Sequence, residues 1–284
     1  MAYFMIILVM LTAASGVVSL IDILCFAKAR KQVVMQQTDF AALNKKAQKL
    51  RLKAPLVADY ARSLFPVFLL VLIVRSFLGG MYDVPTASLL PTVQLNEYLL
   101  VNQFAYGLRL PVINKLIVPI GTPQRGDIAV FHYPVDTHVD FIKTVIGLPG
   151  DKISYLNKKL YINGQAVSQQ FVQNTMEPAN ANLSGANPSS TVSPMLVQEY
   201  RETIGGHMHD IYNSPILPAV DFTNVVVPPG EYFVMGDNRD NSGDSRFWGF
   251  VPDKYLVGKA EFVVFSWDKT TDSVRWNRMG TVLP

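Results

Sequence analysis

The longest apolar stretches of the chain lie near its N-terminal end. Residues 2–21 carry no charge, and about twenty such residues are enough to cross a bilayer as a helix. A second apolar stretch, residues 64–78, is interrupted only by Arg75, which lies close enough to one end to reach the interface. The pattern predicts transmembrane helices over residues 1–27 and 60–80. A cleavable signal peptide is the alternative for the first stretch, and a buried core helix for the second.

The segment between these stretches, residues 28–59, is strongly basic. Residues 28–62 hold nine lysines and arginines against two acids, Asp39 and Asp59. The positive-inside rule therefore predicts a cytoplasmic loop, and it places everything after the second helix outside the cytoplasm. Within the loop, residues 39–52 suit either a short basic helix on the lipid surface or a solvated connector.

After residue 80 the pattern changes to short runs of β-branched and aromatic residues separated by Pro and Gly. Between two runs, Asn163-Gly164 is a strong signal for a hairpin turn. The predicted strands are 98–101, 128–132, 141–146, 159–162, 232–235 and 261–265. The pattern favours a mostly β domain of antiparallel sheets over residues 81–169 and 225–284. Residues 170–224, rich in Asn, Ser, Pro and Thr, are predicted as an inserted loop-rich subdomain.

Composition narrows the classes of protein that fit this pattern. With 49% hydrophobic and 17% charged residues the chain is too apolar to be disordered, and a net charge of +3 does not favour nucleic-acid binding. The single cysteine, Cys25, can form neither an internal disulfide nor a cysteine-based zinc site. His207 and His209 would face one way on a strand, but no acid at a suitable spacing completes a metal site. We therefore expect neither a metal nor a cofactor.

Two further stretches carry side chains that suit nucleophilic chemistry. Ser88 lies between Pro85 and Pro91, which bar a regular helix or central strand, so it is held on a stiff loop. Lys143 lies in a predicted strand with Phe141 on the same face. Alone, each has an ordinary explanation, as a turn serine and an edge-strand lysine. Burial, however, would lower the pKa of Lys143 at a cost of about 3–4 kcal/mol, and a neutral amine accepts the proton of a serine hydroxyl.

The most specific stretch is the polar run 236–246, which reads Gly-Asp-Asn-Arg-Asp-Asn-Ser-Gly-Asp-Ser-Arg. So many short polar side chains suggest a cross-linked loop, in which Asp and Ser bond backbone N–H groups and the arginines pair with carboxylates. A calcium-binding loop is the alternative, but the glutamate that it requires would fall on Gly249.

These three stretches, in this order after two apolar segments, resemble bacterial type I signal (leader) peptidase, a family of serine proteases with a Ser-Lys dyad. The run 236–246 matches every fixed position of the family signature Gly-Asp-Asn-Arg-Asp-Asn-Ser-x-Asp-Ser-Arg. Gly-Leu-Pro-Gly-Asp at 147–151 follows Lys143 at the family's spacing. The resemblance covers most of residues 60–267 and is weak or missing across 170–224.

The resemblance implies a membrane-bound endopeptidase that cleaves N-terminal signal peptides from exported preproteins through an acyl-enzyme. It implies a two-pass protein of the bacterial cytoplasmic membrane with its catalytic domain on the periplasmic side. Ser88 takes the place of the nucleophile and Lys143 that of the general base. The expected partners are preprotein signal peptides and the lipid bilayer, with no nucleic acid. The other site residues that it implies are Thr86 in the oxyanion hole, Ser242 orienting the lysine amine, Asp237, Asp244 and Arg246 in the network that shapes the site, and Tyr82, Val84 and Ile142 in pockets for small side chains.

Two positions depart from the family's pattern. Leu89 replaces the usual methionine, an apolar exchange of similar volume. Thr144 replaces a frequent arginine, which removes a cation near Asp237 and leaves that carboxylate to Arg239 or to another group.

Two other functions explain less of the sequence. A related Ser-Lys protease with another target would differ in the pocket around Val84 and Ile142 and in residues 170–224. A non-enzymatic anchored β domain leaves Lys143 in an apolar strand without a reason.

Overall fold

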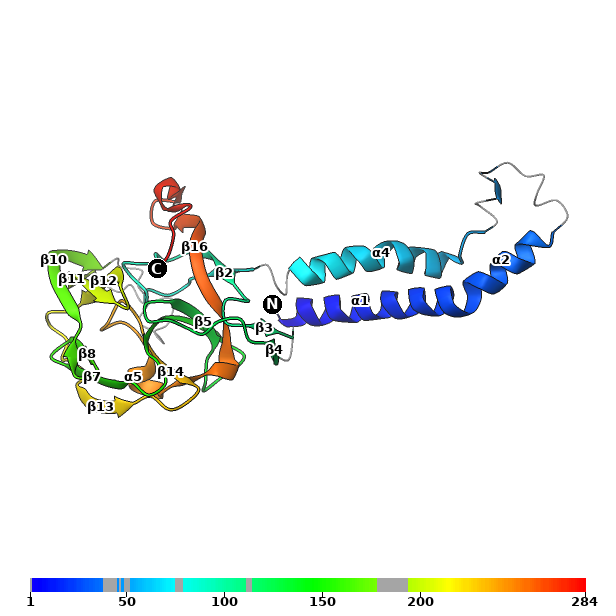
Figure 1. Ribbon diagram of the computed structural model, residues 1–284. Coiled ribbons are helices and arrows are strands. Elements are labelled where there is room, and N and C mark those ends of the chain that lie inside the picture. The colour runs from blue at the N-terminus through cyan, green and yellow to red at the C-terminus, as the bar shows by residue number, and fades with distance from the viewer. Residues whose placement is uncertain are drawn as a thin grey trace. The chain divides into compact units, whose positions relative to one another are not determined.

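The computed structural model describes residues 2–37, 45, 47–48, 52–74, 79–110, 114–177 and 194–284. The chain divides into two compact units, one built mainly on residues 1–76 and the other on residues 77–110 and 114–284. The described part of the first unit is helical, and the second consists mostly of strands (Figure 1). The prediction of a mostly β domain with antiparallel sheets is therefore confirmed.

The helical unit has two long apolar helices that lie side by side (Figure 1). Its elements are α1 (Ala2–Ile21), the π-helical segment η1 (Asp22–Phe26), α2 (Ala27–Met35) and α4 (Leu56–Ile73). Gly16 permits the close approach of α1 to α4, because a Cβ at this position would lie 2.9 Å from the ring of Phe65. Residues Phe4–Met35 and Leu56–Ile73 are long and apolar enough to cross a membrane, by length and composition alone.

The bounds of these helices differ from the predicted 1–27 and 60–80. The first helical run continues to Met35, so the basic segment predicted over 28–59 begins as helix. The second helix begins at Leu56, directly after Pro55 at its N-cap, and Gly80 lies in a strand. Apolar composition does not distinguish the end of a helix from the start of a strand, which is why the prediction ran to residue 80. Arg75 and most of 39–52 lie outside the described residues.

The largest sheet of the β unit has eight strands in the order β1-β2-β16-β5-β6-β14-β15, with β17 paired to β16. Its neighbouring strands run antiparallel. The long strand β16 crosses the domain (Figure 1). The strands are β1 (Gly80–Asp83), β2 (Glu97–Asn102), β5 (Ile128–His132), β6 (Asp140–Gly147), β14 (Glu231–Met235), β15 (Val251–Pro252), β16 (Leu256–Asp268) and β17 (Ser273–Val274).

Two smaller sheets and three short helices complete this part of the domain. One sheet has the order β13-β7-β8-β9 and the other pairs β3 with β4. Asn163 and Gly164 form the predicted hairpin turn between β8 and β9, both with positive φ as a type I′ turn requires. The elements are β3 (Leu108–Arg109), β4 (Leu116–Val118), β7 (Lys152–Leu156), β8 (Lys159–Ile162), β9 (Gln165–Ala166), β13 (Phe222–Val226), α5 (Ser245–Trp248), η4 (Asp253–Tyr255) and η5 (Trp276–Arg278).

The described part of residues 170–224 is largely strand rather than loop, which corrects the prediction of a loop-rich subdomain. β10 (Ser168–Glu177), β11 (Met195–Ile204) and β12 (His207–Asn213) form an antiparallel three-stranded sheet. β13 belongs to the neighbouring sheet, where it pairs with β7. β10 is polar on both faces and mostly exposed, so its sequence lacks the apolar alternation that identifies a strand.

One apolar cluster of the core fixes the segment between β1 and β2. Val84 and Leu89 are fully buried against Leu99 of β2 and Val263 of β16. Backbone bonds add to this, since the N–H of Val84 donates to the carbonyl of Glu97 at 2.9 Å. The four residues between Val84 and Leu89 are therefore held at both ends, and Ser88 is one of them.

Candidate active site

Ser88 and Lys143 lie in direct contact although 55 residues separate them in the sequence. Lys143 Nζ donates a hydrogen bond of 2.6 Å to Ser88 Oγ. Ser88 lies in the loop between β1 and β2, and Lys143 lies in β6. The residues are 1% and 5% exposed, respectively, so water screens this contact little.

The polar run 236–246 holds the loop that carries Ser88 in place. The backbone N–H of Asn238 donates to the carbonyl of Ser88 at 3.1 Å. The side-chain amide of Asn238 donates to the carbonyl of Ala87 at 3.2 Å. Gly236 permits this packing, because a Cβ there would lie 2.4 Å from the carbonyl oxygen of Ser88 and 2.2 Å from Ser242 Oγ. Two loops distant in sequence thus form one rigid unit.

The surroundings of Lys143 favour a neutral amine. Burial lowers the pKa of Lys143 to about 8, while the carboxylates of Asp244 and Asp237 act in the opposite direction. The ring of Phe141 lies on the same face of β6, with its centroid 5.4 Å from Lys143 Nζ. A lysine with a pKa near 8 is deprotonated in a substantial fraction of molecules just above neutral pH, which a general base requires.

Thr86 and Ser242 lie close to Ser88. The contacts of Thr86 suit its predicted role, and those of Ser242 do not show the predicted one. Thr86 Oγ1 lies 3.3 Å from Ser88 Oγ, so its hydroxyl is close to the reacting oxygen. Ser242 is buried, yet among the described residues its hydroxyl has no hydrogen-bond partner. The amine of Lys143 bonds to Ser88 and not to Ser242, so orientation of the amine by Ser242 stays a prediction.

Asp244 and Arg246 form the predicted network within the polar run. Arg246 Nε donates to Asp244 Oδ1 at 2.8 Å, and the second Asp244 oxygen accepts from the N–H of Gly236 at 3.0 Å. Asp244 also caps α5 through the N–H of Arg246. The guanidinium reaches back to the carbonyl of Arg239. This carboxylate therefore fixes both ends of the run.

Asp237 does not pair with Arg239, which was one of the two possibilities that the sequence left open. Its Oδ1 instead accepts a hydrogen bond of 2.7 Å from the hydroxyl of Thr144. Arg239 makes a bidentate pair with Glu202 of β11. His209 of β12 completes the group, with Nε2 3.5 Å from Glu202 Oε2 and 3.8 Å from Asp237 Oδ1. These four residues (Glu202, His209, Asp237 and Arg239) are called the buried charge cluster below.

The sheet β10–β12 bonds directly to the polar run 236–246, which the sequence did not reveal. The N–H of Tyr212 in β12 donates to the carbonyl of Asp237, and the N–H of Arg239 donates to that of Tyr212, each at 2.9 Å. Glu177 of β10 accepts from the amides of Asn238 and Asn241, both at 2.7 Å. In the sequence, the only indication of this contact is that glutamates and a histidine lie among the residues that form these strands.

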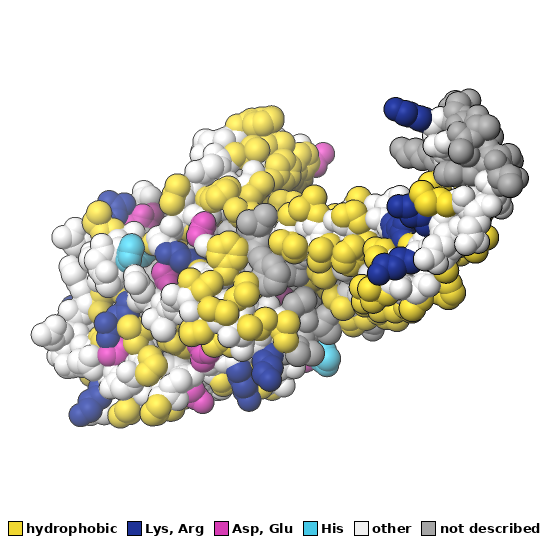
Figure 2. Space-filling model, turned by 45° about the vertical axis from the view of Figure 1, so that its right-hand side comes forward, with side chains coloured by type: hydrophobic (Ala, Val, Ile, Leu, Met, Phe, Trp, Pro, Cys, Tyr) yellow, Lys and Arg dark blue, Asp and Glu magenta, His cyan; other side chains and the backbone are white. Residues whose placement is uncertain are grey.

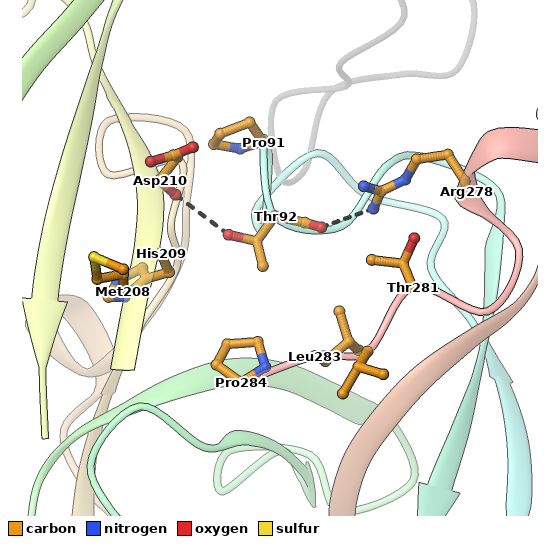
Figure 3. Close-up of a pocket in the computed structure, with 10 residues that line it drawn as sticks. Pro91, Thr92, Met208, His209, Asp210, Arg278, Thr281, Leu283 and Pro284 are labelled. Carbon is orange, nitrogen blue, oxygen red and sulfur yellow. Dashed lines mark hydrogen bonds between the residues drawn. The ribbon is translucent and has the colours of Figure 1, made fainter. Parts of the chain in front are cut away.

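A cavity of about 250 Å³ lies between β12, the loop after Ser88 and the C-terminal residues 281–284. Figure 3 shows Met208, His209 and Asp210 along its one wall. Thr92 Oγ1 donates to the carbonyl of Asp210 at 3.2 Å, and its own carbonyl accepts from Arg278 at 2.8 Å (Figure 3). Neither Ser88 nor Lys143 lines this cavity. Within the described ranges, no three His, Cys, Asp or Glu residues are arranged to hold a metal ion.

The predicted substrate-binding residues lie beside strand edges that carry no described partner. Val84 is fully buried, and Tyr82 and Ile142 pack against the same apolar cluster. β1 is a terminal strand of its sheet. β6 pairs with β14 only from Thr144 onward, so among the described strands residues 140–143 are paired with β5 alone. Both edges offer backbone groups for an added strand.

Comparison with known proteins shows which family and which relatives this chain resembles. The protein-family model described as signal peptidase, peptidase S26, matches residues 57–267. Signal peptidase I of Pseudomonas fluorescens is 38% identical over 98% of both chains, and that of Pseudomonas aeruginosa is 37% identical over 98% of both. A solved signal peptidase I from Enterococcus faecalis is 28% identical, with 49% of this chain and 97% of that chain covered and a TM-score of 0.28.

Proposed function

Because this chain belongs to the bacterial type I signal peptidases of peptidase family S26, we propose that it cleaves signal peptides with Ser88 as nucleophile and Lys143 as general base. Membership in the family implies a peptidase that cleaves signal peptides from preproteins. The observation that carries the finer assignment is the hydrogen bond of 2.6 Å between Lys143 Nζ and Ser88 Oγ, in a site where the pKa of the lysine is low.

The reaction follows from this contact in two balanced steps. Neutral Lys143 takes the hydroxyl proton of Ser88 while Oγ bonds to the scissile carbonyl carbon, and the oxyanion accepts hydrogen bonds from the Ser88 N–H and the Thr86 hydroxyl. Collapse breaks the C–N bond, and the leaving amine takes the proton from the Lys143 ammonium. A water then loses its proton to Lys143 and attacks the acyl carbon; the ester C–O bond breaks, and the Lys143 ammonium returns the proton to Ser88 Oγ.

The strand edges favour an extended substrate. A peptide that added a strand beside residues 82–85 and 140–143 would place alternate side chains toward Val84 and Ile142. Both of these residues belong to a well-packed cluster, so only small side chains fit against them without displacing the core.

The helical unit suits a two-pass anchor with the β unit outside the cytoplasm. Figure 2 shows apolar side chains over the visible face of the helices and Lys and Arg near the end that carries α2. Nine basic residues in 28–62 favour the cytoplasm for that end. Ser88 follows the described end of α4 by only 15 residues, counting from Ile73, so the site would lie near the membrane surface where a substrate emerges.

Substitution of the two dyad residues tests the mechanism. We expect Ser88→Ala and Lys143→Ala to abolish cleavage of a preprotein by the purified full-length chain in detergent micelles. The matched controls are Ser168→Ala and Lys152→Ala, which change exposed residues and should leave the rate unchanged. Full activity in either dyad variant would exclude the assignment.

Labelling of introduced cysteines tests the topology separately. In a Cys25→Ser background, a membrane-impermeant maleimide should label Lys152→Cys in intact spheroplasts, and should label Lys53→Cys only after lysis. The reverse pattern would contradict the proposed orientation.

A further inference from the structure

The buried charge cluster brings two carboxylates and one guanidinium together with side chains that are almost fully buried. The side chains of Glu202, Asp237, Arg239 and His209 are each at most 1% exposed. Glu202 and His209 are cross-strand neighbours in the register of β11 and β12. Arg239 compensates Glu202 through two hydrogen bonds, and Thr144 gives Asp237 a hydroxyl but no charge. One negative charge is therefore left over unless His209 is protonated.

The position of His209 fits an imidazolium. Its Nε2 lies within ion-pair distance of both carboxylates, 3.5 Å from Glu202 Oε2 and 3.8 Å from Asp237 Oδ1, although neither ring nitrogen makes a hydrogen bond to a described residue. Burial alone would lower the pKa of His209, but the Asp237 and Glu202 carboxylates outweigh both burial and the opposing charge of Arg239, so the pKa is raised. A buried unpaired carboxylate is costly, which favours the protonated form of the histidine beside it.

The other charged groups near His209 are engaged elsewhere. Asp210, next to it on β12, pairs with Arg201 of β11 at 2.8 Å. Arg278, which lines the same cavity as His209, pairs with Glu97 at 2.7 Å. Figure 3 shows the Arg278 guanidinium directed to Thr92 on the far side of the cavity from His209. The charge on His209 is therefore set by Glu202, Asp237 and Arg239.

We propose that His209 is a positioning residue whose imidazolium balances Asp237, so that this carboxylate does not hold the proton on Lys143. The proposal rests on the proposed function, since Lys143 is the base that it tunes. Asp237 is one of the two carboxylates that raise the pKa of Lys143. An uncompensated Asp237 would strengthen that effect and make the amine a base only at higher pH.

The pH profile of cleavage by the full-length chain separates this role from a structural one. In His209→Gln we expect the acid limb of kcat/KM to move up by about 0.5–1 pH unit, which lowers the rate below the limb by about three- to tenfold and leaves the alkaline plateau unchanged. His207→Gln changes a histidine two residues away on β12 and should not move the limb. An unmoved limb in His209→Gln, or an equal loss at all pH values, would overturn the proposal.

A double variant tests whether the charge that His209 balances is that of Asp237. Asp237→Asn combined with His209→Gln leaves Glu202 paired with Arg239 and no surplus charge. The limb should therefore return toward its wild-type position, whatever the absolute rate. A limb that stays displaced by the full amount would mean that the charge of Asp237 is not what His209 balances.

A titration that needs no activity distinguishes failure of this proposal from failure of the proposed function. With ¹³C-labelled histidine in the full-length chain, the signal lost in His209→Gln identifies His209 in the NMR spectrum. We expect its ring to stay protonated up to the limb near pH 8, because only a protonated His209 can balance Asp237 there. A ring that is already neutral below this limb would overturn the proposal even if Ser88 and Lys143 act as stated.

Discussion

Two sheets of the β unit contribute to the candidate site in opposite ways. The eight-stranded sheet supplies Lys143, which is buried beside the ring of Phe141 and donates to the hydroxyl of Ser88 in the loop between β1 and β2. The sheet β10–β12 supplies Glu177, Glu202 and His209, whose buried polar groups contact the run 236–246. The difference teaches that the pKa of a lysine falls where burial outweighs the nearby carboxylates, and that the loop beside it is held in place where opposite charges are paired.

The largest effect on stability should come from breaking the ion pair between Arg239 and Glu202 of the sheet β10–β12. Arg239→Met leaves Glu202 buried without its guanidinium, which should lower the free energy of unfolding by about 3–5 kcal/mol. Denaturant unfolding of the full-length chain measures this. Arg201→Met is the matched control, because Arg201 pairs with Asp210 at the surface, and it should change stability little. Equal effects in both variants would remove the distinction between the two pairs.

The next effect belongs to the reacting region and tests the oxyanion hole. Thr86→Val keeps the shape of the side chain but removes the hydroxyl 3.3 Å from Ser88 Oγ. We expect kcat to fall by about 10²–10³-fold, while Thr86→Ser retains most of the rate. If the valine variant cleaved as fast as the wild type, Thr86 would have no place in the oxyanion hole.

A smaller effect tests the contact between the two regions. Gly236→Ala would press a methyl group against the carbonyl of Ser88 and the hydroxyl of Ser242. A displacement of about 1 Å of the nucleophile should lower kcat by about 10²-fold. Gly243→Ala lies in the same run with open space around its Cβ position, and it should be close to wild type. A normal rate in Gly236→Ala would mean that the run does not position Ser88.

The eight-stranded sheet with Ser88 and Lys143 could be predicted from the sequence much better than the sheet β10–β12. Strands such as Ile128–His132 and Lys159–Ile162 have the predicted bounds, because short apolar runs rich in β-branched or aromatic residues form them and Pro and Gly mark the turns. Ser88 and Lys143 were found only because a specific motif at 236–246 accompanied them. That motif singled out the two residues, but it did not show that their side chains are in contact.

The sequence did not predict the sheet β10–β12, for physical reasons. β10 has polar residues on both faces, so no apolar period marks it as a strand. Glu202 and His209 acquire their role only from Asp237 and Arg239, which are 28 to 37 residues away in the sequence. The sequence offers no role for His209 beyond a poor metal site, since its acidic neighbours come from another strand and another loop. From the sequence alone, Thr144 in place of an arginine means that Asp237 loses a cationic neighbour. In the fold, His209 lies beside Asp237 instead.

The pKa of Lys143 is the central claim, and the pH dependence of kcat/KM measures it most directly. Because burial lowers the pKa of this lysine to about 8, and because only the neutral amine takes a proton from Ser88, activity should rise with pH through a limb near pH 8 and then level off. Lys143→Ala should lack both the limb and nearly all of the activity. An acid limb that persisted in Lys143→Ala together with substantial cleavage would contradict the account.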